Sequence, residues 1–149
     1  MHIAIGADHR GFPLKEQLKP WLIGLDHTVE DTGATALDPA DDYPDFGVAV
    51  GRAVATDPDA RGIVLCGSGI GIAIAANKVA NVRAGTCATP EQCRNARADE
   101  DLNVLALSAD ALDFEHAKLV ITAFLETPFS GAERHARRLE KLGHLDHAR

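Results

Sequence analysis

Cysteine and long apolar segments are scarce in this 149-residue sequence, and their scarcity excludes several classes of protein. The three cysteines, Cys66, Cys87 and Cys93, form no C-x-x-C pair, and an odd number of thiols does not suit a disulfide framework. No stretch reaches the roughly 18 consecutive apolar residues that indicate a membrane-spanning helix. The apolar N-terminus lacks the basic flank of a secretory signal. We therefore expect a cytoplasmic protein with reduced thiols and no membrane association.

Basic residues are also few, with 15 Lys and Arg against 22 Asp and Glu and a formal net charge of −7. Affinity for nucleic acids comes mainly from neutralised phosphates, so this balance argues against a nucleic-acid partner. A small anionic ligand remains compatible, because it needs only a few well-placed donors. The length and the 46% hydrophobic content predict one domain, residues 1–149, with a core of its own.

Short apolar runs alternate with longer amphipathic segments about five times along the chain. This alternation predicts an α/β protein, a three-layer α/β/α sandwich around a five-stranded parallel, Rossmann-like sheet. The expected strands are 3–5, 28–31, 62–66, 82–87 and 103–107. The expected helices are 11–25, 46–55, 72–79, 90–98, 114–125 and a basic C-terminal helix at about 130–142. Ser130 is expected to cap that last helix, and Gly143 is expected to follow its end.

Ligands of such sheets bind at the carboxyl ends of the strands, so the residues after each strand are candidates for chemistry. Asp8 and His9 follow the first expected strand, and Cys66 ends the third. The glycine-rich segment 67–71 matches neither the G-x-G-x-x-G nor the G-x-S-x-G pattern. It can be a tight turn without a ligand, or a turn whose N–H groups hold an oxyanion or a phosphate.

Each candidate also has a purely structural interpretation. Cys66 alone would ordinarily be a small buried packing residue, as we expect for Cys87 and Cys93. A thiol that ends a strand and faces the start of a helix, however, can act as a base near neutral pH. Asp8 and His9 can cap a helix or serve the same site as Cys66.

Two basic residues near the C-terminus form another candidate group. Arg134 and Arg138 are four residues apart and therefore share one helix face, either as a solvated surface or as a clamp for an anion. His144 and His147 have a spacing that can bind metal, but a polar tail is the simpler interpretation, and we expect no metal site.

Six motifs occur in the order typical of one known family, and together they span nearly the whole chain. On these motifs the sequence resembles the type B ribose-5-phosphate isomerases and their galactose-6-phosphate isomerase relatives. The motifs are residues 6–12 (GADHRGF), 42–44 (DYP), 66–71 (CGSGIG), 75–78 (AANK), 103–106 (NVLA) and 133–135 (ERH). The resemblance implies aldose–ketose isomerisation of a small sugar phosphate of the ribose 5-phosphate type. It also implies no metal or cofactor, and homodimers or homotetramers with sites shared between subunits.

The resemblance further implies roles for individual residues. Cys66 would move a proton between C1 and C2 of the open-chain sugar, with Asp8 and Tyr43 holding hydroxyls or assisting proton movement. His9, Arg134 and Arg138 would bind the phosphate. The enediolate formed on the way would be stabilised by Ser68 and by the backbone N–H groups around it, at Gly67, Gly69, Ile70 and Gly71.

The sequence departs from the family in two places. Asp99-Glu100 stand where the family usually has His-Asn, and that His is generally credited with opening the sugar ring. Asp110 stands where an Arg commonly helps to bind phosphate, so a carboxylate there would repel the substrate. We expect Asp99 to contact the substrate by its position, and His9 is a candidate to open the ring in place of the missing His.

These departures leave the substrate open. A tetrose 4-phosphate cannot close a furanose ring and needs no ring-opening acid, so an erythrose or erythrulose 4-phosphate isomerase is one alternative. Another sugar is a second, and a partner subunit of a hetero-oligomeric galactose-6-phosphate-type isomerase is a third. A phosphate- or nucleotide-binding module without catalysis is a fourth.

Overall fold

The computed structural model describes residues 1–146, so His147 lies outside the described residues. Five parallel strands form one sheet in the order β2-β1-β3-β5-β4. They are β1 (His2–Ala7), β2 (Thr28–Asp31), β3 (Arg61–Cys66), β4 (Ala84–Thr86) and β5 (Val104–Ser108). The helices are α1 (Phe12–Gly24), α2 (Tyr43–Ala55), α3 (Ile70–Ala76), α4 (Pro90–Glu100), α5 (Phe114–Glu126) and α6 (Glu133–Asp146).

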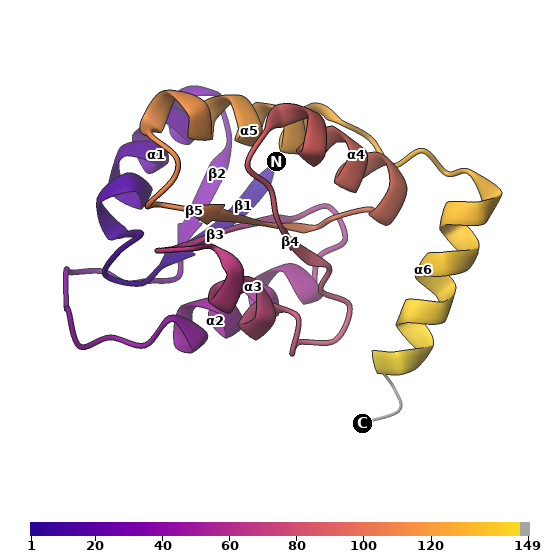
Figure 1. The fold of residues 1–149 in the computed structure, drawn as a ribbon, viewed down its shortest axis with the longest axis horizontal. Helices are drawn as coiled ribbons and strands as arrows, with labels where there is room; N and C mark the ends of the chain where they lie inside the picture. Colours follow the sequence, from indigo (N-terminus) through magenta and orange to yellow (C-terminus); the bar gives the residue numbers. More distant parts are fainter. Residues whose placement is uncertain (147–149) are drawn as a thin grey trace.

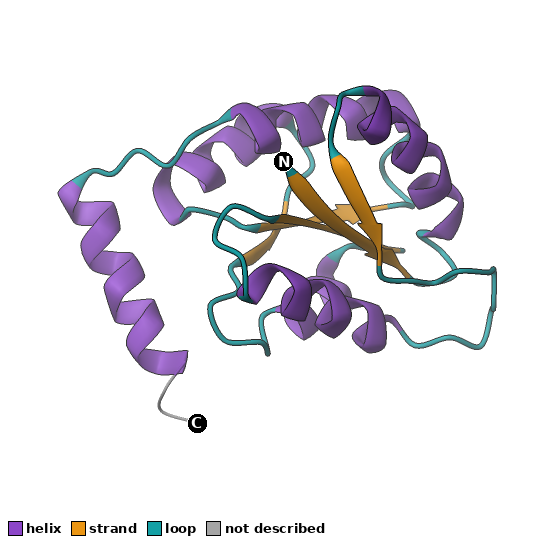
Figure 2. Ribbon diagram, turned by 180° about the vertical axis from the view of Figure 1, so that it is seen from behind, coloured by secondary structure: helices purple, strands orange, loops and turns teal. Residues whose placement is uncertain are grey.

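Helices cover both faces of the sheet, which confirms the predicted three-layer α/β/α architecture. Helices α1, α4 and α5 lie on one face, and α2 and α3 lie on the other (Figures 1 and 2). Side chains of a strand alternate between faces, so Ile63 and Leu65 pack under the first layer while Val64 and Cys66 pack toward α2 and α3. The thiol of Cys66 therefore belongs to the thinner, alanine- and valine-rich half of the core.

The chain reverses its direction of winding at β1. Strand β2 pairs with one edge of β1 and β3 pairs with the other, so the segments that leave β1 and β3 diverge. Such a reversal opens a crevice at the carboxyl ends of the two strands. The register sets Ala7 beside Leu65, and Cys66 beside Ser108 on β5. The segments after β1, β3 and β5 are therefore neighbours at one rim of the sheet.

Helix α6 differs most from the sequence prediction. It begins at Glu133 and continues through Gly143 to Asp146 instead of covering about 130–142. Ser130 does not cap it, because the helix begins three residues later; the Ser130 hydroxyl accepts the Ala132 N–H at 3.3 Å and lies 2.8 Å from Nδ1 of His135. Gly131, with a φ of +64°, turns the chain before the helix. In Figure 1 the helix stands apart from the three layers, at one end of the long axis.

Other boundaries shift for local reasons. Helix α2 begins at Tyr43, three residues before the predicted start, since Pro44 suits the first turn of a helix. Strand β4 is limited to Ala84–Thr86 because the backbone N–H of Arg83 donates to the Asn103 side chain, at 2.7 Å, instead of to a neighbouring strand. Neither shift moves the rim at the carboxyl ends of β1, β3 and β5.

Candidate functional site

The glycine turn after β3, residues 67–71, is built around the sulfur of Cys66. The backbone N–H of Gly69 donates to Cys66 Sγ across 3.1 Å, and the N–H of Ile70 donates to Ser68 Oγ across 3.2 Å. Gly69 has a φ of +76°, and a Cβ there would lie 2.9 Å from the carbonyl carbon of Leu107. Only glycine combines that conformation with that closeness, so Gly69 is what brings an N–H onto the sulfur.

Hydrogen bonds from β4, from β5 and from the segment after β5 hold this turn in place. The Ser108 hydroxyl and the Asp110 N–H both donate to the Gly67 carbonyl oxygen, at 2.8 and 3.1 Å. The Thr86 hydroxyl donates to the Gly69 carbonyl oxygen at 3.1 Å. Because these bonds occupy carbonyl oxygens, the turn is held in one conformation by β4 and β5. Cys66 itself is 4% exposed, so only a small part of its surface is open at the rim.

Asp8 follows β1 and lies beside this turn, buried to 5% exposure. Its Oδ1 accepts the backbone N–H groups of Arg10 and Gly11, both at 3.0 Å. The side chain thus fixes the turn that leads into α1, whereas the helix itself begins after Gly11 without a side-chain cap hydrogen bond. The same bonds hold the carboxylate in a fixed position at the rim.

His9 has a partner that the sequence did not indicate. Its backbone N–H donates to Asp41 Oδ1 at 3.0 Å, and its ring Nδ1 lies 2.7 Å from the same oxygen. With Nδ1 directed at Asp41, Nε2 is the ring nitrogen left for a ligand. The second oxygen of Asp41, Oδ2, is buried and has no hydrogen-bond partner among the described residues. The pairing spans 32 residues, and only the acidic character of the 38–45 loop could have hinted at it.

Two further side chains lie against the glycine turn. A Cβ on Gly71 would be 2.8 Å from Cζ of Tyr43, so the Tyr43 ring rests on that glycine. A Cβ on Gly67 would be 2.8 Å from Cζ of Arg10, whose Nη2 donates to Asp110 Oδ2. The structure thus places Tyr43 at the rim, and it adds Arg10, which sequence reasoning missed. Asp110, expected to repel an anion, is paired with a guanidinium.

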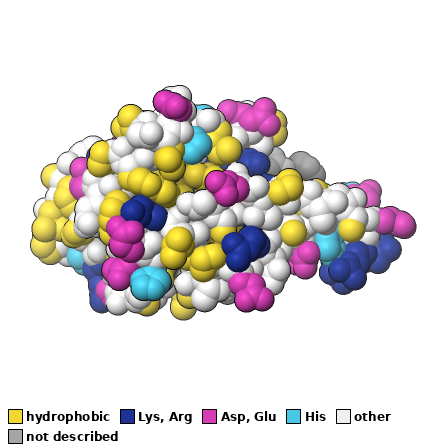
Figure 3. All heavy atoms as spheres, turned by 90° about the horizontal axis from the view of Figure 1, so that it is seen from above, with side chains coloured by type: hydrophobic (Ala, Val, Ile, Leu, Met, Phe, Trp, Pro, Cys, Tyr) yellow, Lys and Arg dark blue, Asp and Glu magenta, His cyan; other side chains and the backbone are white. Residues whose placement is uncertain are grey.

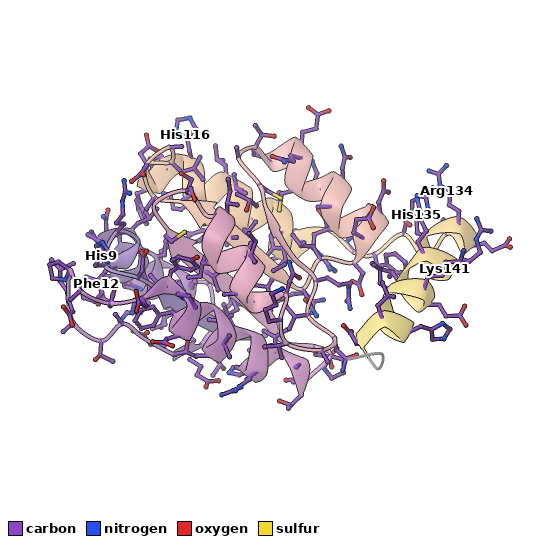
Figure 4. All side chains as sticks on the ribbon, turned by 60° about the horizontal axis from the view of Figure 1, so that its bottom comes forward. His9, Phe12, His116, Arg134, His135 and Lys141 are labelled. Atoms are coloured by element: carbon purple, nitrogen blue, oxygen red, sulfur yellow. The ribbon has the colours of Figure 1, made fainter. Side chains whose placement is uncertain are left out.

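The structure does not bring the remaining predicted residues to this rim. Arg134 and Arg138 lie on α6 and Asp99 lies near the end of α4. Figure 4 shows His9 and Arg134 at opposite ends of the long axis. Figure 3 shows basic side chains gathered at the α6 end. Within one chain, these three residues form a second group, remote from Cys66.

This second group is organised around a buried histidine, His135. Arg134 Nε donates to His135 Nε2 at 2.8 Å, so the proton of a neutral ring is on Nδ1. That nitrogen lies 2.8 Å from Ser130 Oγ and 3.4 Å from Asp99 Oδ1. Asp99 therefore helps to fasten the start of α6 to the end of α4. The arrangement leaves Arg138 exposed on the same helix.

A cavity of about 590 Å³ separates α6 from the edge of the sheet. Its lining includes Val82, Ala84 and Leu102 on the body and Leu139, Leu142 and Leu145 on α6. Leu142 and Leu145 are 47% and 61% exposed. None of its lining residues belongs to the rim around Cys66. The cavity is therefore an apolar cleft distinct from the glycine turn.

Cys87 and Cys93 are buried in the core, as expected of packing residues. Hydrogen bonding with the Cys87 sulfur, together with burial, raises the pKa of the Cys93 thiol. All three cysteines are free thiols. Within residues 1–146 no three His, Cys, Asp or Glu side chains gather as metal ligands. No helix in that range has the length and apolar composition to cross a membrane.

Comparisons with known proteins agree on one family. The family described as Ribose/Galactose Isomerase matches residues 3–142. Ribose-5-phosphate isomerase B of Mycolicibacterium paratuberculosis is 37% identical over 146 residues, covering 98% of this chain and 92% of the relative. D-erythrulose-4-phosphate isomerase of Pectobacterium atrosepticum is 36% identical over 152 residues, covering 99% and 96%.

The fold is also similar to that of a solved structure. Ribose-5-phosphate isomerase B of Mycoplasma genitalium, with ribulose-5-phosphate bound, superposes with a TM-score of 0.94 at 34% identity. The match covers 98% of this chain and 96% of the other. The similarity therefore includes α6 as well as the three layers.

Proposed function

The chain belongs to the ribose/galactose isomerase family, and we propose that it interconverts an aldose and a ketose phosphate of the ribose 5-phosphate and ribulose 5-phosphate type. The family membership predicted from the sequence motifs is confirmed. The observation that carries the proposal is the Cys66 sulfur, which ends β3 and accepts the N–H of Gly69. The bound ribulose-5-phosphate in the Mycoplasma genitalium relative supports the substrate class.

The chemistry is a proton transfer between two adjacent carbons. The Cys66 thiolate removes the proton from C2 of the open-chain aldose, the electron pair forms the C1–C2 double bond, and negative charge moves onto O1. A proton passes from O2 to O1, and the proton held by the sulfur is delivered to C1, which gives the ketose. The N–H on Sγ stabilises the thiolate before the first step, since charged acceptors form the stronger hydrogen bonds.

Donors of the glycine turn suit the intermediate. The Gly69 N–H donates to the sulfur and the Ile70 N–H to the Ser68 hydroxyl, so the turn after Cys66 groups donors that would stabilise the enediolate charge. The carbonyl oxygens of Gly67 and Gly69 accept hydrogen bonds from Ser108 on β5 and Thr86 on β4. The turn is therefore already fixed, and little reorganisation is needed when charge develops. We assign Asp8 and Tyr43 to the sugar hydroxyls, because both are fixed at this rim.

The phosphate is assigned to His9 of one copy and to Arg134 and Arg138 of a second copy. His9 and Arg134 lie at opposite ends of the molecule (Figure 4), and Arg138 is on the same helix as Arg134, so these arginines do not serve the site of His9 within one chain. A homodimer or homotetramer in which α6 reaches a neighbouring subunit would complete each site. The exposed Leu142 and Leu145 beside the apolar cleft support this assembly, since a second copy would cover them.

A tetrose 4-phosphate is a second candidate substrate, favoured by the surroundings of Asp99. An ordinary aspartate carboxylate carries no proton at neutral pH and cannot protonate a ring oxygen. Asp99 moreover lies beside His135, in a structural contact. An open-chain tetrose phosphate needs no ring opening, and the similarity to D-erythrulose-4-phosphate isomerase of Pectobacterium atrosepticum supports this alternative.

Initial rates of the purified chain test the proposal directly. The panel is ribose 5-phosphate, allose 6-phosphate, galactose 6-phosphate and erythrose 4-phosphate. Preference for ribose 5-phosphate supports the first assignment, and preference for erythrose 4-phosphate supports the second. No turnover of any sugar by the chain alone overturns the proposal of a self-sufficient isomerase. We further propose a cytoplasmic location, which the three free thiols support.

A further inference from the structure

Arg10 and Asp110 meet across the rim although 100 residues separate them in the sequence. Arg10 comes two residues after Asp8, and Asp110 comes two residues after the end of β5. Nη2 of Arg10 donates to Oδ2 of Asp110, and both side chains are about half exposed. An ion pair this exposed contributes little to stability, so stability alone does not account for it.

The pair holds the guanidinium on the backbone next to Cys66. A Cβ on Gly67 would lie 2.8 Å from Nε and Cζ of Arg10 and 3.0 Å from Nη1, so the group rests directly on that glycine. Asp110 is anchored at the same place, because its own N–H donates to the Gly67 carbonyl oxygen at 3.1 Å. The guanidinium therefore contacts Gly67 directly and is also bonded to Asp110, which is itself anchored to Gly67. Asp110 thus sets the position of the guanidinium.

Most donors of this guanidinium are unused. An arginine side chain carries five N–H donors, and only Nη2 has a partner within residues 1–146. Nε and Nη1 are the free nitrogens, and they are the ones that lie by Gly67. Arg10 is also the only Lys or Arg among the rim residues described above, whereas Asp8 and Asp110 are both acidic. A dianionic ligand at this rim needs such a cation.

The position of His9, the residue before Arg10, indicates which part of the substrate Arg10 contacts. His9 directs Nε2 away from Asp41, so consecutive residues offer nitrogens to a ligand. In the proposed mechanism the oxygens that become charged at C1 and C2 are assigned to the glycine turn, where the Gly69 N–H donates to Cys66 Sγ. The donors of Arg10, next to His9, are left for the phosphate.

We propose that Arg10 binds the substrate phosphate through Nε and Nη1, and that Asp110 is its positioning residue. This inference rests on the proposed function and adds a phosphate ligand from the chain that supplies Cys66. The carboxylate at position 110 then orients a cation instead of repelling the substrate. Specificity for a phosphorylated sugar comes in part from this pair.

Kinetics of Arg10→Met, Arg10→Lys and Asp110→Asn test the proposal, with Arg52→Met as a matched control because Arg52 is exposed on α2. Each variant is assayed for kcat and KM with the preferred sugar of the panel and for competitive inhibition by inorganic phosphate. Arg10→Met should raise KM and the phosphate inhibition constant about 10- to 100-fold with kcat nearly unchanged, the effect of losing hydrogen bonds to a charged group. Arg10→Lys should retain part of the affinity, and Arg52→Met should change neither constant.

Asp110→Asn should raise KM less than Arg10→Met, and it should add nothing in the Arg10→Met background, because it acts through the guanidinium. The proposal is overturned if Arg10→Met lowers only the melting temperature, which indicates a structural pair. It is also overturned if kcat falls while KM and phosphate inhibition stay constant, which assigns Arg10 to the enediolate. Calorimetric titration with inorganic phosphate still tests Arg10 if the protein turns over no sugar, so the two failures are distinguishable.

Discussion

Asp99 Oδ1 lies 3.4 Å from Nδ1 of His135, so the residue at the position of the family's ring-opening histidine serves instead to join α4 to α6. A carboxylate therefore stands where the resemblance to the family implies the acid that opens a ring-forming sugar. The rate of isomerisation should therefore be lowered for pentose and hexose phosphates, whose rings must open, and not for an open-chain tetrose phosphate.

Replacing Asp99 by histidine should therefore change substrate preference. Asp99→His should raise kcat for ribose 5-phosphate by about 100-fold or more, as a positioned general acid does, and leave erythrose 4-phosphate unaffected. The ratio of the two initial rates measures this. Asp99→Asn is the control and should leave the ratio unchanged. An equal effect of Asp99→His on both sugars would mean that ring opening is not its function.

A buried ion pair under α1 should make stability depend on pH. The Lys15 ammonium is fully buried and donates to both oxygens of Asp31 at 2.7 Å. Burial alone would raise the pKa of Asp31, but the hydrogen bonds from Lys15 and Lys19 outweigh it and lower that pKa. A lowered folded-state pKa contributes stability above the unfolded value of about 3.9, and this is lost as pH falls through the folded-state value.

Asp31→Asn should reduce the free energy of unfolding at pH 7 by about 1.5–3 kcal/mol, the typical worth of hydrogen bonds to a charged group, because buried Lys15 then keeps only Glu16, at 3.1 Å, as a counter-ion. It should also flatten the loss of stability below about pH 4. Urea denaturation from pH 7 to pH 3 measures both effects. Asp59→Asn, at an exposed loop position, serves as the control. A variant as acid-sensitive as the parent protein would contradict this account of the pair.

The conformation of Gly69 should be indispensable to the turn. Gly69→Ala should cost about 1–2 kcal/mol for the left-handed conformation alone, plus the clash with the Leu107 backbone. Activity should fall more steeply than stability, since the N–H on Cys66 Sγ would move. Gly143→Ala, in open space within α6, should instead stabilise the protein by about 0.5–1 kcal/mol. Thermal melting and kcat measured together distinguish the two positions.

Complementation between two inactive variants should reveal a shared site. Cys66→Ala and the double variant Arg134→Met, Arg138→Met should each be nearly inactive. Mixed dimers contain one intact site when Cys66 and the arginines come from different copies, so co-refolding should restore about a quarter of the parental activity. Arg137→Met, also exposed on α6, is the control and should remain active alone. No recovery in the mixture would place all three groups in one chain.

The architecture was predictable because its signals are local. The apolar run at β3 and the amphipathic spacing along α1 each lie within a few residues, and both elements form as predicted. The glycines after Cys66 likewise indicated a turn that could present N–H groups. The limits of α6 were less predictable, since the Ser130 hydroxyl accepts the Ala132 N–H in the turn before the helix and lies beside His135.

Pairings across the rim could not be predicted from one sequence. His9 meets Asp41, and Arg10 meets Asp110, only because the parallel register brings separate loops together. Asp110 therefore suggested repulsion of an anion until its cation was located. The distance between Arg134 and Cys66 is likewise a property of the whole fold, and no spacing in the sequence encodes it.

The most direct test of the central claim is the incorporation of solvent deuterium into product by the parent protein and by Cys66→Ala, with Cys87→Ala as the control thiol. If the Cys66 sulfur carries the proton between C1 and C2, the parent and Cys87→Ala should label the product carbon during turnover in deuterated water, and Cys66→Ala should neither turn over nor label. Continued carbon labelling at the parental rate by Cys66→Ala would show that another group is the base.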